Sequence, residues 1–264
     1  MPSLREIRSK IKSVRSTEQI TKAMKMVAAA RMRKSQAAIV AARPFAVKME
    51  RTVRDLALLE VRSDLAAARE VQIHPLFDRK QGAELLCVAV GRKCRDLVHR
   101  IKGQELEIVS ELVGVFPKIS FVHAELVGQA VLDAYLNKGV SSVTVLYNEF
   151  KSVATQKLVT TALLPIPVPE AVSDAVELPD YGFEPHRQEL LSALLPRHIK
   201  AQLYRILLES QAAELASRMN AMDAASKNAK ELREALNLDA NRTRQSLITK
   251  EIAELVGGAE ALAA

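Results

Sequence analysis

Residues 3–36 read SLREIRSKIKSVRSTEQITKAMKMVAAARMRKSQ, and the spacing of their apolar side chains decides the fold. The first apolar residues follow one another at steps of three and four: Leu4, Ile7, Ile11 and Val14. Such steps place side chains on one face of a helix. The phase shifts at residues 16–18, and the pattern then continues to about residue 59. This stretch predicts one helix of a coiled coil with a single irregularity, roughly 80 Å long.

A second apolar pattern of the same kind occupies the C-terminal part of the chain. It begins near Leu190, or more firmly beyond Pro196, and it resumes in phase after a stretch of poor helix formers at residues 237–246. Neither helix has enough apolar surface to form a core by itself. We therefore expect the two helices to pack as a long antiparallel coiled coil. Pro44 should bend or interrupt the first helix, because it lacks an N–H and crowds the preceding turn.

The middle of the chain has short apolar segments, and their pattern predicts strands that alternate with helices. Three apolar or β-branched runs predict strands, at residues 84–90, 141–150 and 158–166. Two further segments predict helices, at residues 91–103 and 121–139, the second with Gly139 at its C-terminal end. Alternating strands and helices are typical of an α/β domain. The predicted fold class is therefore α/β, with a long antiparallel coiled coil of the terminal helices and a small Rossmann-like α/β domain.

The expected domain boundaries lie where the long helical patterns give way to the short strand and helix segments. They are an N-terminal coiled-coil helix at residues 1–62, a central α/β domain with a proline-rich return loop at residues 63–189, and a C-terminal coiled-coil helix at residues 190–264. The chain is 48% hydrophobic but only 4% aromatic, which favours long helices over a β-sandwich. It has no run of about 18 apolar residues and no apolar core of a signal peptide, so we expect a soluble cytoplasmic chain.

Positive charge is concentrated in the N-terminal helix. Residues 1–62 hold fifteen basic and five acidic side chains, and the whole chain has a net charge of +7. Such a segment is compatible with binding to nucleic acid, to an anionic membrane surface or to an acidic protein, and also with a solvated helix face. Phe45 is the only aromatic residue before Phe77, so side chains that could stack on bases are not interleaved with the basic ones.

Motifs for catalysis are absent from the sequence. It has no glycine-rich phosphate loop and no G-x-G-x-x-G, and its five histidines are scattered. Cys87 and Cys94 lie seven residues apart without histidine at metal-ligand spacing, so Cys87 is interpreted as a buried small hydrophobe and a redox bridge as the minority alternative. We predict no catalytic residue, no metal and no cofactor, and a chain that works mechanically or as a binding partner.

Four stretches of the sequence form a recognisable pattern: residues 3–36, LYNEF at 146–150, LLPRHIKAQLYRILLESQAAELASRMNAMDAASKNA at 194–229, and RQSLITKEIAELVGGAEALAA at 244–264. Together they resemble the gamma subunit of bacterial F-type ATP synthase. One departure concerns the centre. After the strand that ends at Val90, the family has a glycine- and cysteine-containing loop and another βα unit, and some thirty residues of this pattern are missing here.

The resemblance implies a rotor shaft. Such a subunit couples proton-driven rotation of the membrane c-ring to conformational cycling of catalytic beta subunits, and it regulates ATPase activity and proton flow. The implied partners are the alpha3beta3 hexamer, the epsilon subunit and the c-ring, with one copy of the chain per complex and no nucleic acid. The implied location is peripheral, at the cytoplasmic face of the inner membrane, which the chain would touch only through the c-ring. Catalysis lies on the beta subunits in this family, so the chain would be no enzyme on its own.

The resemblance also assigns four groups of residues. A bearing tip is formed by Ile248, Ile252, Leu255, Ala259 and Leu262. A latch for a beta-subunit loop is formed by Arg244, Gln245 and Thr249, and a shaft contact by Met24 and Lys25. A foot that faces the c-ring and epsilon is formed by Tyr181, Phe183 and Glu184. Two plainer alternatives remain at this stage: Met24 as an ordinary coiled-coil residue, and the foot as a loop packed on its own domain.

Overall fold

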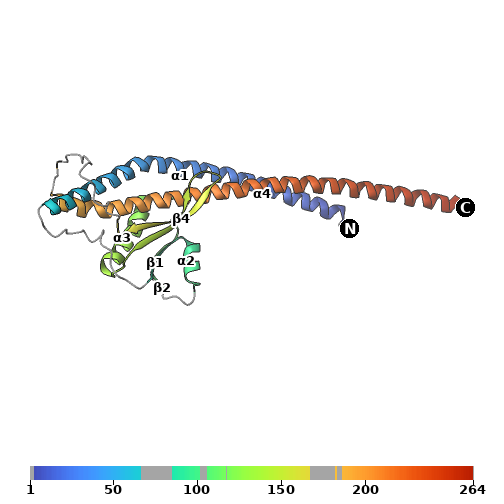
Figure 1. Ribbon diagram of the computed structural model, residues 1–264. Helices are drawn as coiled ribbons and strands as arrows, with labels where there is room; N and C mark the ends of the chain where they lie inside the picture. The colour runs from blue at the N-terminus through green and yellow to red at the C-terminus, as the bar shows by residue number, and fades with distance from the viewer. Residues whose placement is uncertain are drawn as a thin grey trace. The chain divides into compact units, whose positions relative to one another are not determined.

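Two long helices dominate the computed structural model, which describes residues 3–66, 85–101, 106–116, 118–166, 182 and 186–263. They are α1, Leu4–Ala66, and α4, Arg187–Ala263 (Figure 1). The elements between them are β1 (Leu85–Val90), α2 (Arg92–Val98), β2 (Leu106–Leu112), α3 (Phe121–Asn137), β3 (Val143–Phe150) and β4 (Gln156–Leu164). The predicted combination of terminal helices with a small α/β domain is confirmed.

The chain forms two compact units. The helical unit consists of Met1–Met32 with Leu215–Ala264, and the α/β unit of Arg33–Glu214. In the helical unit, α1 and α4 run antiparallel. Lys25 of α1 contacts Asp223 of α4, and Glu18 of α1 contacts Arg233 of α4. Glu18 precedes Lys25 by seven residues, whereas Arg233 follows Asp223 by ten residues, so the two helices run in opposite directions. The buried side chains of this unit come from both helices: Ile7, Thr21, Ala28, Met32, Leu215, Ala216 and Ala229.

A capping box stabilises the N-terminus of α1, and both long helices continue through an internal proline. The backbone N–H of Ser3 donates to the carboxylate of Glu6 at 3.2 Å, and the N–H of Glu6 donates to the Ser3 hydroxyl at 3.3 Å. This reciprocal capping box satisfies two N–H groups that have no partner within the helix. The predicted interruption at Pro44 does not occur, because α1 is helical on both sides of it. Likewise, Pro196 lies inside α4.

The α/β unit contains two small sheets rather than one. Strands β1 and β2 pair in parallel, and β3 and β4 pair antiparallel. The three predicted strands are confirmed as β1, β3 and β4, whereas β2 was not predicted. Gly91 connects β1 to α2 at a φ of +99°, and its N–H donates to the Leu112 carbonyl at the end of β2. That backbone conformation strongly favours glycine.

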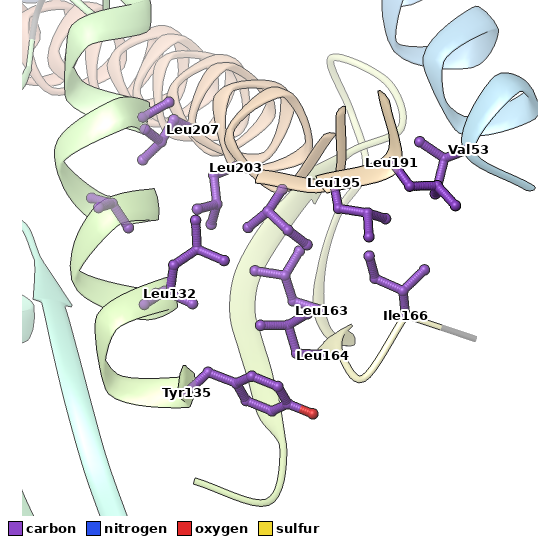
Figure 2. Close-up of a cluster of buried hydrophobic side chains, with 14 of the residues drawn as sticks. Val53, Leu132, Tyr135, Leu163, Leu164, Ile166, Leu191, Leu195, Leu203 and Leu207 are labelled. Atoms are coloured by element: carbon purple, nitrogen blue, oxygen red, sulfur yellow. The ribbon is translucent and has the colours of Figure 1, made fainter. Parts of the chain in front are cut away.

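The core of the α/β unit is built on one face of α4. Its leucine and isoleucine side chains recur at four-residue steps: Leu191, Leu195, Ile199, Leu203 and Leu207. They pack with Val53 and Leu56 of α1, with Val131, Leu132 and Tyr135 of α3, and with Leu163 and Leu164 of β4. Figure 2 shows the labelled members of this cluster, among them Val53, Leu132 and Leu195, converging from the helix and strand ribbons. In this unit the apolar face of α4 therefore covers the α/β domain as well as α1.

The two cysteines are free in this fold. Cys87 is half-buried and Cys94 is exposed, so the burial predicted for Cys87 is only partial and the redox bridge is not formed. Burial and the neighbouring Cys94 raise the pKa of the Cys87 thiol. Among the described helices, none is long and apolar enough to cross a membrane.

Candidate functional site

The end of α4 extends beyond the start of α1 in the helical unit. Leu4, the first residue of α1, lies level with the segment of α4 around residues 237–244, because both line one groove. The last part of α4 therefore has no neighbour from the described part of α1, as the red end of the ribbon in Figure 1 shows. We call this last part of α4, residues 246–263, the overhang. It is about five helical turns long.

Apolar side chains of the predicted bearing tip are exposed on the overhang. The exposed fraction is 48% for Ile248, 56% for Ile252 and 74% for Leu255, and Ala259 is also exposed. The backbone of Leu262 is helical, and its side chain lies outside the described part of the structure. Burying apolar surface against a partner is worth about 25 cal/mol per Å² and requires no particular orientation. The overhang is thus suited to contact with a smooth apolar wall.

The three residues of the predicted latch lie at the base of the overhang. Arg244 lines the groove between α1 and α4, and Gln245 next to it is exposed. The hydroxyl of Thr249 donates to the backbone carbonyl of Gln245 at 3.0 Å. Because its proton is used within the helix, the Thr249 hydroxyl can only accept a hydrogen bond from another molecule. The side chains of Arg244 and Gln245 remain available as donors.

The predicted shaft contact is divided between two environments. Met24 is 43% exposed, and it shares an exposed apolar stripe with Ile20 and Val27, so its side chain is not buried in the helix interface. Lys25 instead donates to Asp223 of α4 at 2.6 Å. This hydrogen bond, followed by one from Lys227, lowers the pKa of Asp223. Lys25 therefore already has a partner within the chain.

A groove at the base of the overhang was not predicted. It has a volume of about 340 Å³, and seven residues line it: Leu4, Arg8 and Ile11 of α1, with Asn237, Ala240, Asn241 and Arg244 of α4. The lining therefore contains two guanidinium groups, two side-chain amides and three aliphatic side chains. Such a lining can donate several hydrogen bonds and can accept few.

Two titratable groups of the α/β unit lie away from solvent: His198 is buried and Glu209 is half-buried. Burial raises the pKa of Glu209, while Arg205, whose Nε lies 3.2 Å from a carboxylate oxygen of Glu209, lowers it. Burial lowers the pKa of His198, and the charge of Glu50 opposes that shift. No group of three or more His, Cys, Asp or Glu side chains could hold a metal ion within the described ranges. The predicted foot, Tyr181, Phe183 and Glu184, lies outside the described residues.

Two antiparallel helices with an apolar end, joined to a small α/β domain, define a shaft-like class of subunit. The sequence model of the ATP synthase family matches residues 3–83 and 63–262. The ATP synthase gamma chain of Anaeromyxobacter sp. (strain K) is 42% identical, covering 99% of this chain and all of that relative. The gamma chain of Elusimicrobium minutum is 38% identical, covering 99% of each chain. The chain therefore belongs to the ATP synthase gamma chain family, and its function is that of a rotor-shaft subunit.

Solved structures agree on the fold at low sequence identity. The chain of the Euglena gracilis mitochondrial ATP synthase in rotational state 3 has a TM-score of 0.58 at 16% identity, covering 98% of this chain and 94% of that one. The rotor of the same organism in rotational state 1 has a TM-score of 0.54 at 16% identity, covering 93% of this chain and 98% of that one.

The relatives are longer in the aligned region. The alignment with the Anaeromyxobacter chain has 296 positions, 32 more than the 264 residues of this chain. This excess agrees with the absence of about thirty residues expected from the sequence.

Proposed function

We propose that the helical unit is an axle whose overhang turns inside a ring of three alpha and three beta subunits. The observation that carries this proposal is the exposure of Ile248, Ile252 and Leu255 on a helix with no neighbour from the described part of α1. A rotating contact must cost nearly the same free energy at every angle. Apolar contact meets that need because its strength follows buried area rather than the alignment of donors and acceptors.

The same unit is asymmetric, and this supports a role in coupling. One face of the axle carries α1 with the exposed stripe of Ile20, Met24 and Val27, and another carries α4. A single asymmetric axle in a threefold ring presents a different face to each beta subunit. Each face favours a different conformation of the nucleotide site, and rotation passes these preferences around the ring. In this proposal the beta subunits catalyse and the chain is non-catalytic, while its angle regulates ATPase activity and proton flow.

The proposed latch adds an angle-dependent grip at the base of the overhang. Arg244 and Gln245 donate to an acidic loop of a beta subunit, and the Thr249 hydroxyl accepts. A hydrogen bond to a charged group contributes roughly 1.5–3 kcal/mol net. Two such bonds hold one angle and still break at each driven step. On α1, Met24 and Lys25 are the proposed contact with a beta-subunit loop.

The predicted foot completes the proposed assembly. Tyr181, Phe183 and Glu184 contact the c-ring and the epsilon subunit, since aromatic side chains commonly anchor interfaces. One copy of the chain serves each complex, without a cofactor. The chain lies peripherally at the cytoplasmic face of the inner membrane and meets the membrane only through the c-ring. The bacterial origin of the gamma chain relatives supports this location.

A charge placed on the overhang tests the bearing. Leu255→Asp should lower the turnover of the assembled enzyme, because a carboxylate facing an apolar wall loses its hydration. Leu255→Ala should have a smaller effect. Both variants should leave the unfolding midpoint of the isolated chain unchanged, since Leu255 is mostly exposed. Equal turnover in Leu255→Asp and the wild type would rule out the bearing.

A second pair of variants tests the latch separately. Gln245→Leu should impair ATP synthesis by the complex in membrane vesicles, while the helix content of the isolated chain stays constant. Leu262→Ala is the matched control and should matter far less, because many apolar side chains share the bearing contact. Wild-type synthesis rates in both variants would contradict the latch.

A further inference from the structure

A carboxylate is enclosed at the junction of α4 with β3 in the α/β unit. Only 13% of the Glu209 side chain is exposed, and its Oε2 is shielded from solvent and has no hydrogen-bond partner among the described residues. One helical turn earlier on α4, the Nε of Arg205 lies 3.2 Å from Oε1 of Glu209. One carboxylate oxygen therefore lies beside a cation, while the other is buried without a partner. Ionisation is costly for an oxygen in that place, because it has lost its hydration.

The groups around Glu209 come from three elements and act in opposite directions on its charge. Burial is the largest influence, and it raises the pKa of Glu209 above the ordinary value for a glutamate. Arg205 opposes this shift, whereas the like charge of Glu149 on β3 adds to it. Two smaller influences favour the ionised form: a hydrogen bond from Tyr147 of β3 and the charge of Arg43 of α1. The net effect of closing the junction is to favour a proton on the carboxyl.

The hairpin of β3 and β4 depends on side chains for its attachment to α4. In the described part of the chain, these two strands pair only with each other. Val145 of β3, with Leu163 and Leu164 of β4, packs against the core that α4 shares. Tyr147 is 8% exposed and lies on the same face of β3 as Val145, so it extends this packing to Glu209. Such an attachment can open locally while the rest of the chain stays folded.

We propose that the junction of β3 with α4 at Glu209 is a pH-sensitive switch. When the carboxyl carries a proton, Glu209 is neutral and β3 packs closely on α4. When the proton is released to solvent, the ionised carboxylate draws water into the junction, Tyr147 separates from Glu209, and the hairpin of β3 and β4 loosens. The switch needs no partner subunit, so it is independent of the bearing and the latch.

The direction of the switch follows from the raised pKa. The extra stability of the closed junction is fully present below the ordinary glutamate pKa, and it is lost as pH rises through the raised value. His198, also on α4, has the opposite effect: burial lowers its pKa, so its contribution is lost as pH falls. Because the two groups oppose each other in the global stability, the switch must be measured locally, in the hairpin.

Hydrogen exchange of the full chain measures this local opening. The readout is the protection of the amides in β3 and β4, corrected for the intrinsic effect of pH on exchange. Glu209→Gln imitates the protonated carboxyl. It should match the wild type at pH 4 and protect the hairpin roughly tenfold more at pH 8, the difference expected if closure raises this pKa by about one unit. Glu189→Gln is the matched control, because Glu189 is an exposed glutamate of the same helix, and it should follow the wild type at both pH values.

Two outcomes of that experiment would overturn the switch. Equal protection of the wild type and Glu209→Gln at pH 8 would show that ionisation of Glu209 does not open the hairpin. Weaker protection in Glu209→Gln at pH 4 would show that the carboxyl has a structural role that an amide cannot replace.

Replacing the two neighbours on β3 tests whether Glu209 is the group that titrates. Glu149→Gln removes a like charge, so it should move the titration midpoint of Glu209 to lower pH. Tyr147→Phe removes a hydrogen bond that favours the ionised carboxylate, so it should move the midpoint to higher pH. Carboxyl NMR titration of the full chain measures these midpoints, and the signal that disappears in Glu209→Gln identifies the residue. A wild-type midpoint at or below the ordinary glutamate value, or shifts in the same direction in both variants, would contradict the proposal.

Discussion

The hydroxyl of Ser35 on α1 donates a hydrogen bond to Oε1 of Gln211 on α4 at 2.9 Å, and both side chains are buried. Such a bond contributes modestly to stability, but it is formed in only one register of the two helices. Sliding either helix out of this register would break the bond and leave the buried Ser35 hydroxyl without this acceptor. The pair therefore specifies which residues of α1 and α4 face each other within the α/β unit.

Ser35→Ala should lower the free energy of unfolding by about 0.5–1.5 kcal/mol, because it removes one hydrogen bond between buried side chains. Urea denaturation followed by circular dichroism measures the difference. Ser13→Ala is the control, since Ser13 is exposed on the same helix and should change stability by less than about 0.5 kcal/mol. A Ser35→Ala effect as small as the control's would show that the bond does not stabilise the interface.

Lys25→Met should raise the pKa of Asp223 toward the ordinary value for an aspartate. The hydrogen bond from Lys25 is the largest cause of the lowered pKa, and the one from Lys227 is the second. Carboxyl NMR titration of the isolated chain measures the midpoint, and Lys227→Met should give a smaller rise. Because the pKa is lowered in the folded state, the stabilisation is present above the ordinary aspartate pKa and is lost as pH falls through the lowered value. An unchanged midpoint in Lys25→Met would contradict the contact.

The stability of the chain should fall as pH drops below the ordinary pKa of histidine, and His198 should cause part of this fall. Burial lowers the pKa of His198, so the unfolded chain takes up its proton at a higher pH than the folded chain. The loss begins near the unfolded value and is complete below the lowered folded value. Urea midpoints from pH 8 to pH 5 measure it. His198→Leu should flatten the profile, whereas the exposed His186 should be replaceable by leucine without that change.

The isolated chain should neither bind nor hydrolyse ATP appreciably. Its sequence has no glycine-rich phosphate loop, and the proposed function places catalysis on the beta subunits. Calorimetric titration of the chain with MgATP should show no heat of binding at a stoichiometric site. Micromolar binding would contradict this prediction.

The long helices could be predicted from the sequence, because their apolar periodicity extends over many turns. At Pro44 the sequence predicted a bend or an interruption, and the interruption does not occur for a tertiary reason. Ala46 and Val53, which follow the proline, are buried, and this packing holds the helix together where the proline removes one hydrogen bond. Strand β2 escaped prediction because its pairing with β1 is not local. Its segment LEIVSEL has charged residues at two of seven positions, and strand preference depends strongly on the neighbouring strand.

Some surface features could likewise be predicted from the sequence, and others could not. The apolar stripe of the overhang could be predicted because its residues recur within one segment, whereas the extension of α4 beyond α1 was not predicted. The contacts of Lys25 with Asp223 and of Glu18 with Arg233, and the groove of Arg8 and Arg244, could not. They depend on the register of α1 against α4, which neither segment's periodicity contains. Within one helix these residues look like ordinary solvated charges.

Gly257 and Gly258 lie inside the helical overhang. Each glycine in a helix interior costs about 1 kcal/mol relative to alanine, and here no neighbouring helix of the described chain offsets that cost. The overhang needs no nucleation, since it continues α4, but its last turns gain only the small free energy of propagation. Outside the complex, amide hydrogens beyond Gly257 should therefore exchange at rates close to those of an unstructured peptide. Entry into the ring would protect them, so that the bearing completes its folding during assembly.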